Sequence, residues 1–486
     1  MAKKSKNQET DHGKFVRMEK TTLDEVSHFL FAVGNQFVTA KNASAAFDCF
    51  KYAVDLNPKF QPAVYNLGCI YNVTGNLEGA YRMFKEAIRM RPEDIVARTA
   101  FGEIARKLGN VEESGRVLTE ALALDPENYL VMSALAILHY DNGRLAEAAE
   151  WNEKAIEKMG RFDAHMTLNR ALLNMTTGKW SDWWNLYEFC LSYAKNPKMK
   201  GLSMSESWSG DEHEGKTLLV VSDQGAGDAL QFSRYLKEAK ELGKFSKLVF
   251  LCPPELKTIL ARVDGIDEVL GFNEQPKANF DKFSSLLGIM RVLQINPHNC
   301  YRDPHLTARP KLQTRWEHTI SGYCEPGQKR VGLVWAGDPR HGNDHARSLP
   351  LSQFWKLTDV PNVAFFSLQV DDKVKQLQTL DTIIPSQIHD IGSEIRDYDD
   401  TAAAISCLDL IISCDTSIAH AAGGLGKNSW ILIANPPEWR WLSDLQTTAW
   451  YKNTRLFRQT KPRDWDPVLA AVREELTIFA RHDDQE

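Results

Sequence analysis

The sequence lacks the features that would point to a membrane or secreted protein. It has no run of about 18 apolar residues, the length that a membrane-spanning helix needs, so we expect no transmembrane segment. Residues 1–14 are polar and have none of the apolar core of a signal peptide. The eight cysteines are scattered and form no C-x-x-C pair, which argues against a zinc ribbon and against a disulfide framework. We therefore expect reduced thiols and a cytoplasmic protein.

A strong charge of one sign is also missing. The net charge of −6 is spread thinly over 486 residues, so the composition does not favour a nucleic-acid partner. Hydrophobic residues make up 43% and charged residues 25% of the chain, as in ordinary globular proteins. A chain of this length is expected to form more than one domain.

The first third of the chain repeats itself. Each interval of 34 residues carries two helical patterns separated by a glycine, which is typical of tetratricopeptide repeats. We predict a polar tail over residues 1–25 and a repeat solenoid over residues 26–195, whose last, tryptophan-rich unit forms a cap. Its concave face would bind a peptide or protein; a spacer or a dimerisation surface are the alternatives. The recurring residues are Pro58, Pro92 and Pro126; Gly75, Gly109 and Gly143; and Ala53, Ala87, Ala121 and Ala155.

The pattern changes after a predicted linker at residues 196–216. Short apolar runs then alternate with amphipathic helices, beginning with TLLVV at residues 217–221 and beginning again with RVGLVWAG at residues 330–337. This order predicts parallel sheets covered by helices, hence an α/β fold. We predict two Rossmann-like lobes, over residues 217–327 and 328–486, with a last helix closing the fold. In such sheets ligands bind at the carboxyl ends of the strands.

One predicted strand runs directly into polar residues, in the segment LIISCDTSIAHAAGGLGK. A helix starting near Ser417 would offer its first amides, together with Thr416 and Ser417, to a phosphate or diphosphate. Asp415 would cap this helix and orient the loop. His420 either faces the ligand or packs on the sheet, and Gly423 would allow a close contact between helix and sheet. The glycines here do not match a P-loop, because position 421 is Ala.

The first lobe opens with a similar loop, SDQGAGDAL. Gly225 and Gly227 lie in it, but position 230 is Leu, so the loop lacks the third glycine of the G-x-G-x-x-G dinucleotide motif. Asp228 stands at the mouth of this loop. It is either a general base that faces a phosphate site across a cleft or a residue that caps a helix.

Two arginines after a strand of the second lobe are candidates for holding phosphate oxygens, because guanidinium groups make bidentate contacts. We favour Arg347 over Arg340 because it lies just before the next predicted helix. The acidic residues 397–399 (DYD) are interpreted as a helix start, where the helix dipole favours them, and not as a D-x-D metal site. We predict no metal and no cofactor.

Together these stretches resemble the family 9 glycosyltransferases, whose best-known members are the lipopolysaccharide heptosyltransferases. They resemble more closely bacterial tetratricopeptide-repeat proteins that carry such a domain. The resemblance rests on GAGDALQFSRYL, VGLVWAGDPRHGNDHARSLPL, LDLIISCDTSIAHAAGGLGK, PPEWRWL and WYKNTRLFRQ. It implies a GT-B fold and an inverting, metal-independent transfer from a nucleotide-diphosphate sugar.

The resemblance also assigns roles. Asp228 matches the family's proposed base, and Arg347 stands where heptosyltransferases commonly have Lys. Ser417 stands where those enzymes usually have Gly. The repeats are absent from the heptosyltransferases, so their acceptor does not carry over to this chain. The family's donor-diphosphate loop corresponds to Asp415, Thr416, Ser417 and His420.

Two classes of function remain open. The chain transfers a sugar to a protein or glycan acceptor, with the repeats recruiting that acceptor or another partner. Alternatively it is a non-catalytic scaffold whose GT-B lobes hold a nucleotide or a glycan. Homodimerisation through the repeats is a further possibility that no specific residue supports.

Overall fold

A computed structural model describes residues 9–179, 202, 204–274, 280–341, 343–370, 372–381, 387–443 and 445–481. The chain divides into two compact units. The first comprises Met1–Tyr140 and Arg144–Phe162, and the second comprises Asp141–Gly143 and Asp163–Glu486. The predicted tryptophan-rich cap falls on residues 180–195, outside the described residues.

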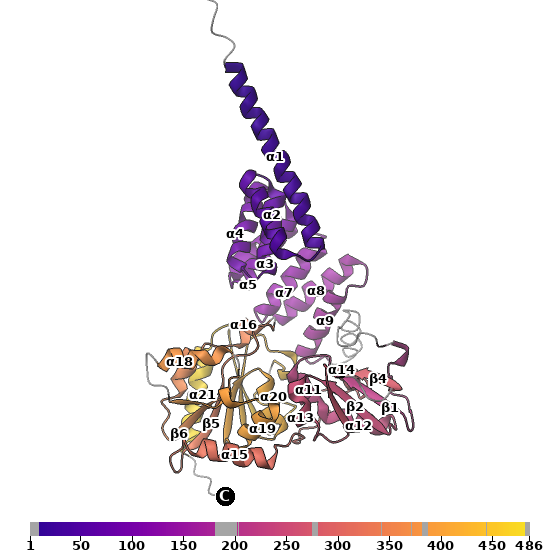
Figure 1. Ribbon diagram of the computed structural model, residues 1–486, viewed down its shortest axis with the longest axis vertical. Coiled ribbons are helices and arrows are strands. Elements are labelled where there is room, and N and C mark those ends of the chain that lie inside the picture. Colours follow the sequence, from indigo (N-terminus) through magenta and orange to yellow (C-terminus); the bar gives the residue numbers. More distant parts are fainter. Residues whose placement is uncertain are drawn as a thin grey trace, which may run out of the picture. The chain divides into compact units, whose positions relative to one another are not determined.

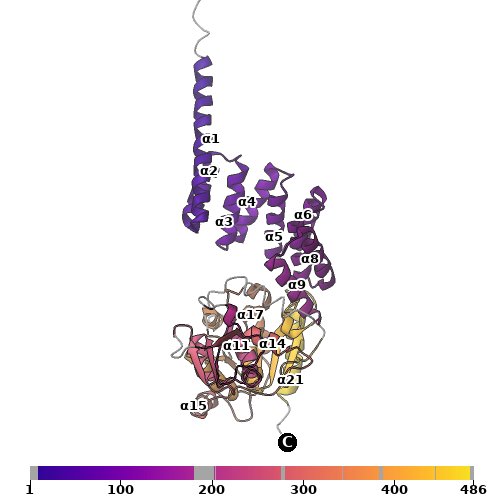
Figure 2. The same cartoon turned by 90° about the vertical axis from the view of Figure 1, so that its right-hand side faces the viewer.

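The first unit is a helical solenoid. Figure 2 shows its helices following one another as antiparallel pairs. Side-chain caps start several of them; Asn76, for example, accepts a hydrogen bond from the amide of Gly79 at 2.8 Å. Gly75 and Gly109 end first helices with positive φ angles of 81° and 86°, a conformation that glycine adopts without strain. The helices are α1 (Glu9–Thr39), α2 (Ala43–Leu56), α3 (Gln61–Val73), α4 (Leu77–Met90), α5 (Ile95–Lys107), α6 (Val111–Leu124), α7 (Tyr129–Asp141) and α8 (Leu145–Met159), and α9 (Ala164–Thr176) follows in the second unit.

Small residues let the paired helices approach closely. A Cβ atom at Gly68 would lie 2.8 Å from the ring of Phe84, so the ring of α4 packs directly on the backbone of α3. Ala80 and Phe84 are buried together with Phe101 of the next repeat, which joins neighbouring repeats through one continuous core. This packing explains why the interval between repeats is constant.

The second unit contains two parallel sheets covered by helices (Figure 1). We call the part around the first sheet the first lobe and the part around the second sheet the second lobe. The first sheet has the order β3-β2-β1-β4 and the second the order β10-β9-β8-β5-β6-β7. The strands are β1 (Thr217–Val221), β2 (Lys247–Cys252), β3 (Glu268–Gly271), β4 (Lys282–Ser285), β5 (Lys329–Val334), β6 (Val363–Ser367), β7 (Ile388–Asp390), β8 (Leu410–Cys414), β9 (Ser429–Ile433) and β10 (Thr454–Arg458).

Helices connect these strands, as the predicted alternation requires. Every strand pair in the two sheets is parallel. The helices are α11 (Ala226–Phe232), α12 (Leu236–Leu242), α13 (Lys257–Leu260), α14 (Leu286–Val292), α15 (Pro310–Ser321), α16 (Asp344–Arg347), α17 (Leu351–Phe354), α18 (Lys375–Asp381), α19 (Tyr398–Ser406), α20 (Ser417–Gly424) and α21 (Asp466–Phe479).

The two lobes share a buried core. Phe232 of α11 stacks on Trp439 of the second lobe, with ring centres 6.3 Å apart. Both side chains belong to one apolar cluster, which also contains Leu218 of β1 and Ile411 of β8. The lobes are therefore held against each other by apolar contacts as well as by ion pairs.

Some segment boundaries differ from the sequence prediction. Trp208, in the predicted linker, is fully buried, and its amide donates to Phe283 O at 2.8 Å, so this segment packs on the first lobe. Glu317 of α15 pairs with Arg330 at 2.7 Å, which attaches α15 to the second lobe. The last helix, α21, was expected to close the fold, and its ion pair between Asp466 and Lys356, at 2.6 Å, ties it to the second lobe.

No helix of the described segments combines the length and the apolarity needed to cross a membrane.

Candidate functional site

The loop after β1 places Asp228 at the carboxyl end of the first sheet. Gly225 precedes helix α11, and Oδ2 of Asp228 accepts a hydrogen bond from the Gly225 amide at 3.0 Å. Asp228 is therefore the third residue of the helix and supports its start from within, which is one part of the predicted capping interpretation. Its other carboxylate oxygen faces the second lobe.

Arg440 of the second lobe pairs with that oxygen. Its guanidinium contacts the carboxylates of Asp228 and Glu438, and its Nε donates to Oε1 of Gln231 at 3.0 Å. The guanidinium carbon lies 4.1 Å from the centre of the Trp439 ring, a cation–π contact. One arginine thus joins Asp228, on the first lobe, to Glu438, on the second.

The segment after β8 starts helix α20 as predicted, but with a different cap. Thr416, and not Asp415, is the N-cap residue, and its Oγ1 accepts from the amide of Ile418 at 3.3 Å. The hydroxyl of Ser417 lies 2.6 Å from that of Tyr398. Asp415 precedes the cap and is partly exposed. Thr416 caps the helix in place of Asp415 because its short hydroxyl reaches the second helical amide from the cap position.

His420 lies where the two lobes meet. It is 5% exposed, stacks on Trp441 with ring centres 5.4 Å apart, and places Nδ1 at 2.9 Å from the hydroxyl of Tyr451. Burial, reinforced by the positive charges of Arg440, Arg234 and Arg347, lowers the pKa of His420 well below its ordinary range. The ring is therefore neutral and packs against the aromatic side chains of Trp441 and Tyr451.

The loop glycines permit this close contact. A Cβ atom at Gly227 would lie 2.8 Å from Cδ2 of His420 and 3.6 Å from Cα of Ser417, so α11 approaches α20 directly. Gly423, expected against the sheet, lies instead against Tyr451, whose ring would be 2.4 Å from an added Cβ. The close approach that the sequence predicts is real, but its partner is a tyrosine ring.

Arg347 lies at the carboxyl end of the neighbouring strand β5. An added Cβ at Gly337, just after that strand, would be 2.7 Å from its Nη2, so the guanidinium covers the backbone there. The side chain is 15% exposed, and its Nε is 3.6 Å from Oδ1 of Asp344. Lys373 lies 3.5 Å from the same carboxylate. Arg340, by contrast, is 89% exposed and pairs with Asp338.

Charge is unevenly distributed over these groups. Burial is the largest cause of the raised pKa of Glu438. Arg440 opposes the rise, and the charges of Asp415 and Asp228 add to it. Burial, and after it the charge of Arg347, lowers the pKa of His341, and the charges of Asp415, Asp344 and Asp228 oppose this. The carboxylates of Asp228 and Glu438 contact Arg440, and Asp415 acts electrostatically on both Glu438 and His341. Arg347 and Lys373 gather around Asp344.

Sequence reasoning missed three of these residues. Arg440 and Glu438 lie in PPEWRWL, which served the resemblance but was given no role. Two buried tryptophans, Trp439 and Trp441, flank the arginine, and a charged residue between buried aromatics was the available signal. Asp223, just after β1, is 7% exposed, and burial raises its pKa to about 6. Nothing in its sequence context distinguished it from a loop residue.

The acidic residues of the segment 397–399 serve the start of α19, while Tyr398 between them contacts Ser417. Asp397 caps α19 by accepting from the amides of Asp399 and Asp400, at 3.0 and 2.9 Å. Asp399 pairs with Arg262 of the first lobe and with Arg309. This is the helix-start arrangement that the sequence predicts.

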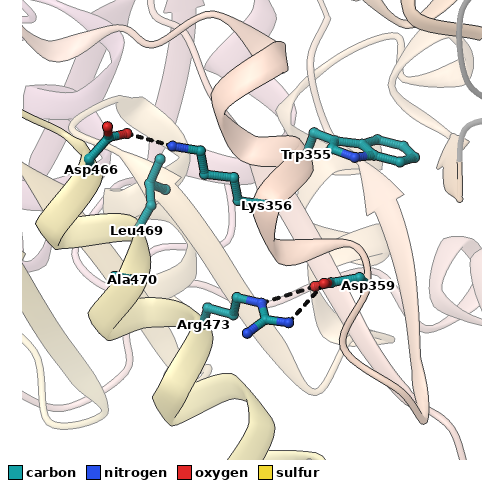
Figure 3. Close-up of a pocket in the computed structure, with 7 residues that line it drawn as sticks. All are labelled: Trp355, Lys356, Asp359, Asp466, Leu469, Ala470 and Arg473. Atoms are coloured by element: carbon teal, nitrogen blue, oxygen red, sulfur yellow. Dashed lines mark hydrogen bonds and ion pairs between the residues drawn. The ribbon is translucent and has the colours of Figure 1, made fainter.

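A separate hollow of about 520 Å³ lies on the second lobe, between α21 and the turn at residues 355–359 (Figure 3). Two ion pairs cross it, Lys356 with Asp466 and Arg473 with Asp359. Each charge in these pairs is balanced by its partner. The residues that meet at the carboxyl ends of β1, β5 and β8 include carboxylates, arginines, a histidine and the start of a helix, so we take this edge as the candidate site.

The repeats present exposed apolar side chains. Val96 and Leu130 occupy the same place in successive repeats, 34 residues apart, and are 60% and 53% exposed. Val73 is 76% exposed at the end of α3. Nearby polar groups pair with each other, as Lys107 does with Asn72 at 3.1 Å.

Family comparison confirms the repeats. The tetratricopeptide-repeat family matches residues 62–94 and 99–179. These matches lie inside the predicted solenoid and include α9.

Among curated proteins, Protein FlbA of Caulobacter vibrioides is 25% identical to this chain over 366 residues. The match covers 71% of this chain and 61% of the relative, so the chain spans less than two thirds of that protein's length.

Among solved structures, the MamA protein is 17% identical, with 37% of this chain and 98% of that chain covered and a TM-score of 0.30. The thermophilic TPR protein TTC0263 of Thermus thermophilus is also 17% identical, with 36% and 95% covered and a TM-score of 0.32.

Proposed function

We propose that the second unit is a GT-B glycosyltransferase module that moves a sugar from a nucleotide-diphosphate sugar to an acceptor hydroxyl, with inversion. The repeats would recruit the acceptor or a partner. One observation carries the proposal. Asp228 after β1 and the Asp415–His420 segment after β8 belong to different lobes, yet α11 and α20 are in direct contact at the carboxyl ends of these strands. Ligands of parallel sheets bind at this edge.

The positive and negative side chains of the site support separate places for the donor and the acceptor. Arg347, Lys373 and the first turn of α20 suit a diphosphate, because positive groups and helix amides stabilise anions. The carboxylates around Arg440 would repel a diphosphate and suit the acceptor hydroxyl. We assign the donor to the first group and the acceptor to the second.

The proposed reaction is a single displacement. The acceptor oxygen attacks the anomeric carbon while its proton passes to the Asp228 carboxylate. The bond from the anomeric carbon to the phosphate oxygen breaks, and its electron pair leaves with the nucleotide diphosphate. Fixed positive groups that face this developing charge lower the barrier, which is why the proposal requires no metal ion.

The acceptor is less constrained. Tetratricopeptide repeats commonly bind peptides or proteins, which favours a protein acceptor or an accessory protein over a glycan. A non-catalytic scaffold that only holds a nucleotide is the second candidate. The ion pair that occupies Asp228 in this structure is the observation that favours it.

Thermal stability against ADP, GDP, UDP and CDP, with and without EDTA, tests the proposal. A nucleotide at about a hundred times its Kd adds about 2.7 kcal/mol to the free energy of unfolding. We expect one nucleotide to raise the midpoint regardless of EDTA. Its sugar conjugates then serve as donors in a turnover assay.

Variants assign the roles. Arg347→Ala should lower turnover about a hundredfold or more, since one lost electrostatic contact costs about 2.7–4 kcal/mol. The control Arg340→Ala removes an exposed arginine of the same loop and should leave turnover unchanged. Asp228→Asn should abolish turnover and keep the nucleotide shift. A nucleotide shift without turnover of any donor would favour the scaffold, and no shift at all would refute the nucleotide site.

A further inference from the structure

The guanidinium of Arg440 is held on every side. Glu438 and Asp228 contact its two terminal nitrogens, and Oε1 of Gln231 accepts from Nε at 3.0 Å. The ring of Trp439 lies on one of its faces, and that of Phe232 lies 5.6 Å from its central carbon. The side chain is only 11% exposed. An arginine with this many partners has one orientation, and a lysine could not reproduce it because its ammonium is a single point charge.

The fixed guanidinium of Arg440 also orients the carboxylate of Asp228. The amide of Gly225 binds one carboxylate oxygen at 3.0 Å, and Arg440 binds the other. Both oxygens are then fixed relative to the second lobe. Each carboxylate oxygen has a second lone pair, so an acceptor hydroxyl can still donate to it. A base that is oriented by a third group is the arrangement that activated nucleophiles commonly require.

Glu438 has a different effect on the same guanidinium. A guanidinium paired with Asp228 alone would hold that negative charge and make proton transfer to it less favourable. A second carboxylate on Arg440 takes up part of the positive charge. Burial is the largest cause of the raised pKa of Glu438; Arg440 opposes the rise, and the nearby charges of Asp415 and Asp228 add to it.

We propose that Arg440 is the positioning residue of the transferase site: it orients Asp228 for proton transfer, and Glu438 balances its charge. The inference rests on the proposed function, because it assigns Arg440 a role in that reaction. The competing interpretation is that Arg440 only ties the two lobes together.

Arg262 provides a matched control for that interpretation. It also crosses between the lobes, pairing with the buried carboxylate of Asp399, and its side chain is 25% exposed. Arg262→Ala therefore removes an inter-lobe arginine outside the site. If Arg440 is only a tie between lobes, Arg440→Ala and Arg262→Ala should behave alike.

The experiment measures nucleotide release from the sugar donor, in the full chain, with water or the acceptor as the attacking group. The donor is the sugar conjugate of the nucleotide that stabilises the wild type. We expect Arg440→Ala to lower kcat about a hundredfold or more, the scale of a general-base contribution, with little change in the donor Kd. Millimolar guanidinium should restore part of kcat in this variant. It should restore nothing in Asp228→Asn, where the carboxylate itself is missing.

Further variants complete the test. Arg440→Lys should stay as slow as Arg440→Ala, and Glu438→Gln should lower kcat to an intermediate level. Arg262→Ala should lower the melting temperature and keep kcat. Equal kcat in Arg440→Ala and wild type would overturn the inference. So would a loss of donor affinity that accounts for the whole effect, or a kcat loss in Arg262→Ala of the same size.

If the proposed function itself is wrong, the wild type gives a different result from the one expected above. In that case the wild type itself neither binds a nucleotide nor releases one from any donor, and the role of Arg440 falls with it. A wild type that turns over a donor, with variants that depart from the expected pattern, overturns the role of Arg440 alone.

Discussion

Replacing Gly227 by alanine tests the contact between the two lobes most directly. The new Cβ would lie 2.8 Å from Cδ2 of His420, closer than such atoms can approach. His420 cannot move aside easily, because Trp441 stacks on its ring and Tyr451 is hydrogen-bonded to Nδ1. The substitution must therefore push α11 and α20 apart or displace this aromatic group.

Two effects set the magnitude. Overpacking of this kind costs about 1–3 kcal/mol. Alanine in place of glycine within a helix recovers about 0.5–1 kcal/mol, and Gly227 lies in the first turn of α11. The net loss in the free energy of unfolding lies between about 0 and 2.5 kcal/mol and centres on about 1 kcal/mol, which lowers the melting temperature by about 2–4 °C in a unit of this size.

Tryptophan fluorescence reports on the correct unit. Trp151 is the only one of the 13 tryptophans that precedes residue 163, so the signal follows unfolding of the second unit. Gly227→Ala is measured in the wild type and in a His420→Ala background. Without the imidazole ring the clash is gone, and the substitution should become neutral or stabilising.

Gly225→Ala is the matched control in the same loop. The nearest atom to its added Cβ is Oδ2 of Asp228, at 3.4 Å, which is an ordinary contact. Its small effect should be the same in both backgrounds, because the two sites do not touch. If Gly227→Ala costs as much without His420 as with it, the inferred packing of α11 on α20 is wrong.

Two further predictions concern buried carboxylates. Asp399→Asn should lower the free energy of unfolding by about 2–3 kcal/mol, less than the 3–5 kcal/mol of a fully buried pair, because Arg262 and Arg309 are 25% and 52% exposed and can regain water. Urea unfolding measures the loss, and a change below about 0.5 kcal/mol would contradict a structural role for this pair. Asp223 has a pKa raised by burial to about 6. The folded state therefore holds its proton more tightly than the unfolded state. Stability should fall by about 2 kcal/mol between pH 4 and pH 6.5 on this account. Asp223→Asn should flatten this part of the stability curve, and parallel curves for variant and wild type would contradict the assignment.

The repeats were predictable because their signal is local. Each turn needs a glycine with positive φ, as at Gly75 and Gly109, and each helix pair needs a small residue, such as Gly68 against Phe84. These requirements recur every 34 residues, so they appear in the sequence as a period. The parallel sheets were predictable for a similar reason, since a buried strand is a short apolar run followed by a helix.

Boundaries were less predictable, because they depend on contacts between distant segments. Trp208 lies in a polar stretch that resembles a linker, yet it is fully buried beside Phe245. Trp316 lies on α15 before the second sheet begins, and its indole donates to Asp400 at 3.3 Å. The location of each segment depends on contacts of individual residues with distant parts of the chain, and periodicity does not register single residues.

In the candidate site, too, some residues were predictable from the sequence and others were not. Thr416, Ser417, Asp228 and Arg347 could be identified because each follows a strand, and the carboxyl ends of parallel strands meet at one edge. Arg440 follows the same rule only loosely, since it lies several residues beyond β9 and pairs with a carboxylate 212 positions earlier in the chain.

What holds Arg440 in place is the pair of tryptophans beside it. Trp439 stacks on Phe232 of the first lobe, and Trp441 stacks on His420 of the second. Because both aromatic neighbours are buried between the lobes, the arginine between them must also lie there, and a buried guanidinium needs carboxylate partners. Asp228 and Glu438 supply them. The arginine that contributes to the contact between the lobes therefore also contacts the carboxylate that the proposed reaction uses, so the proposal links lobe packing to proton transfer through Arg440.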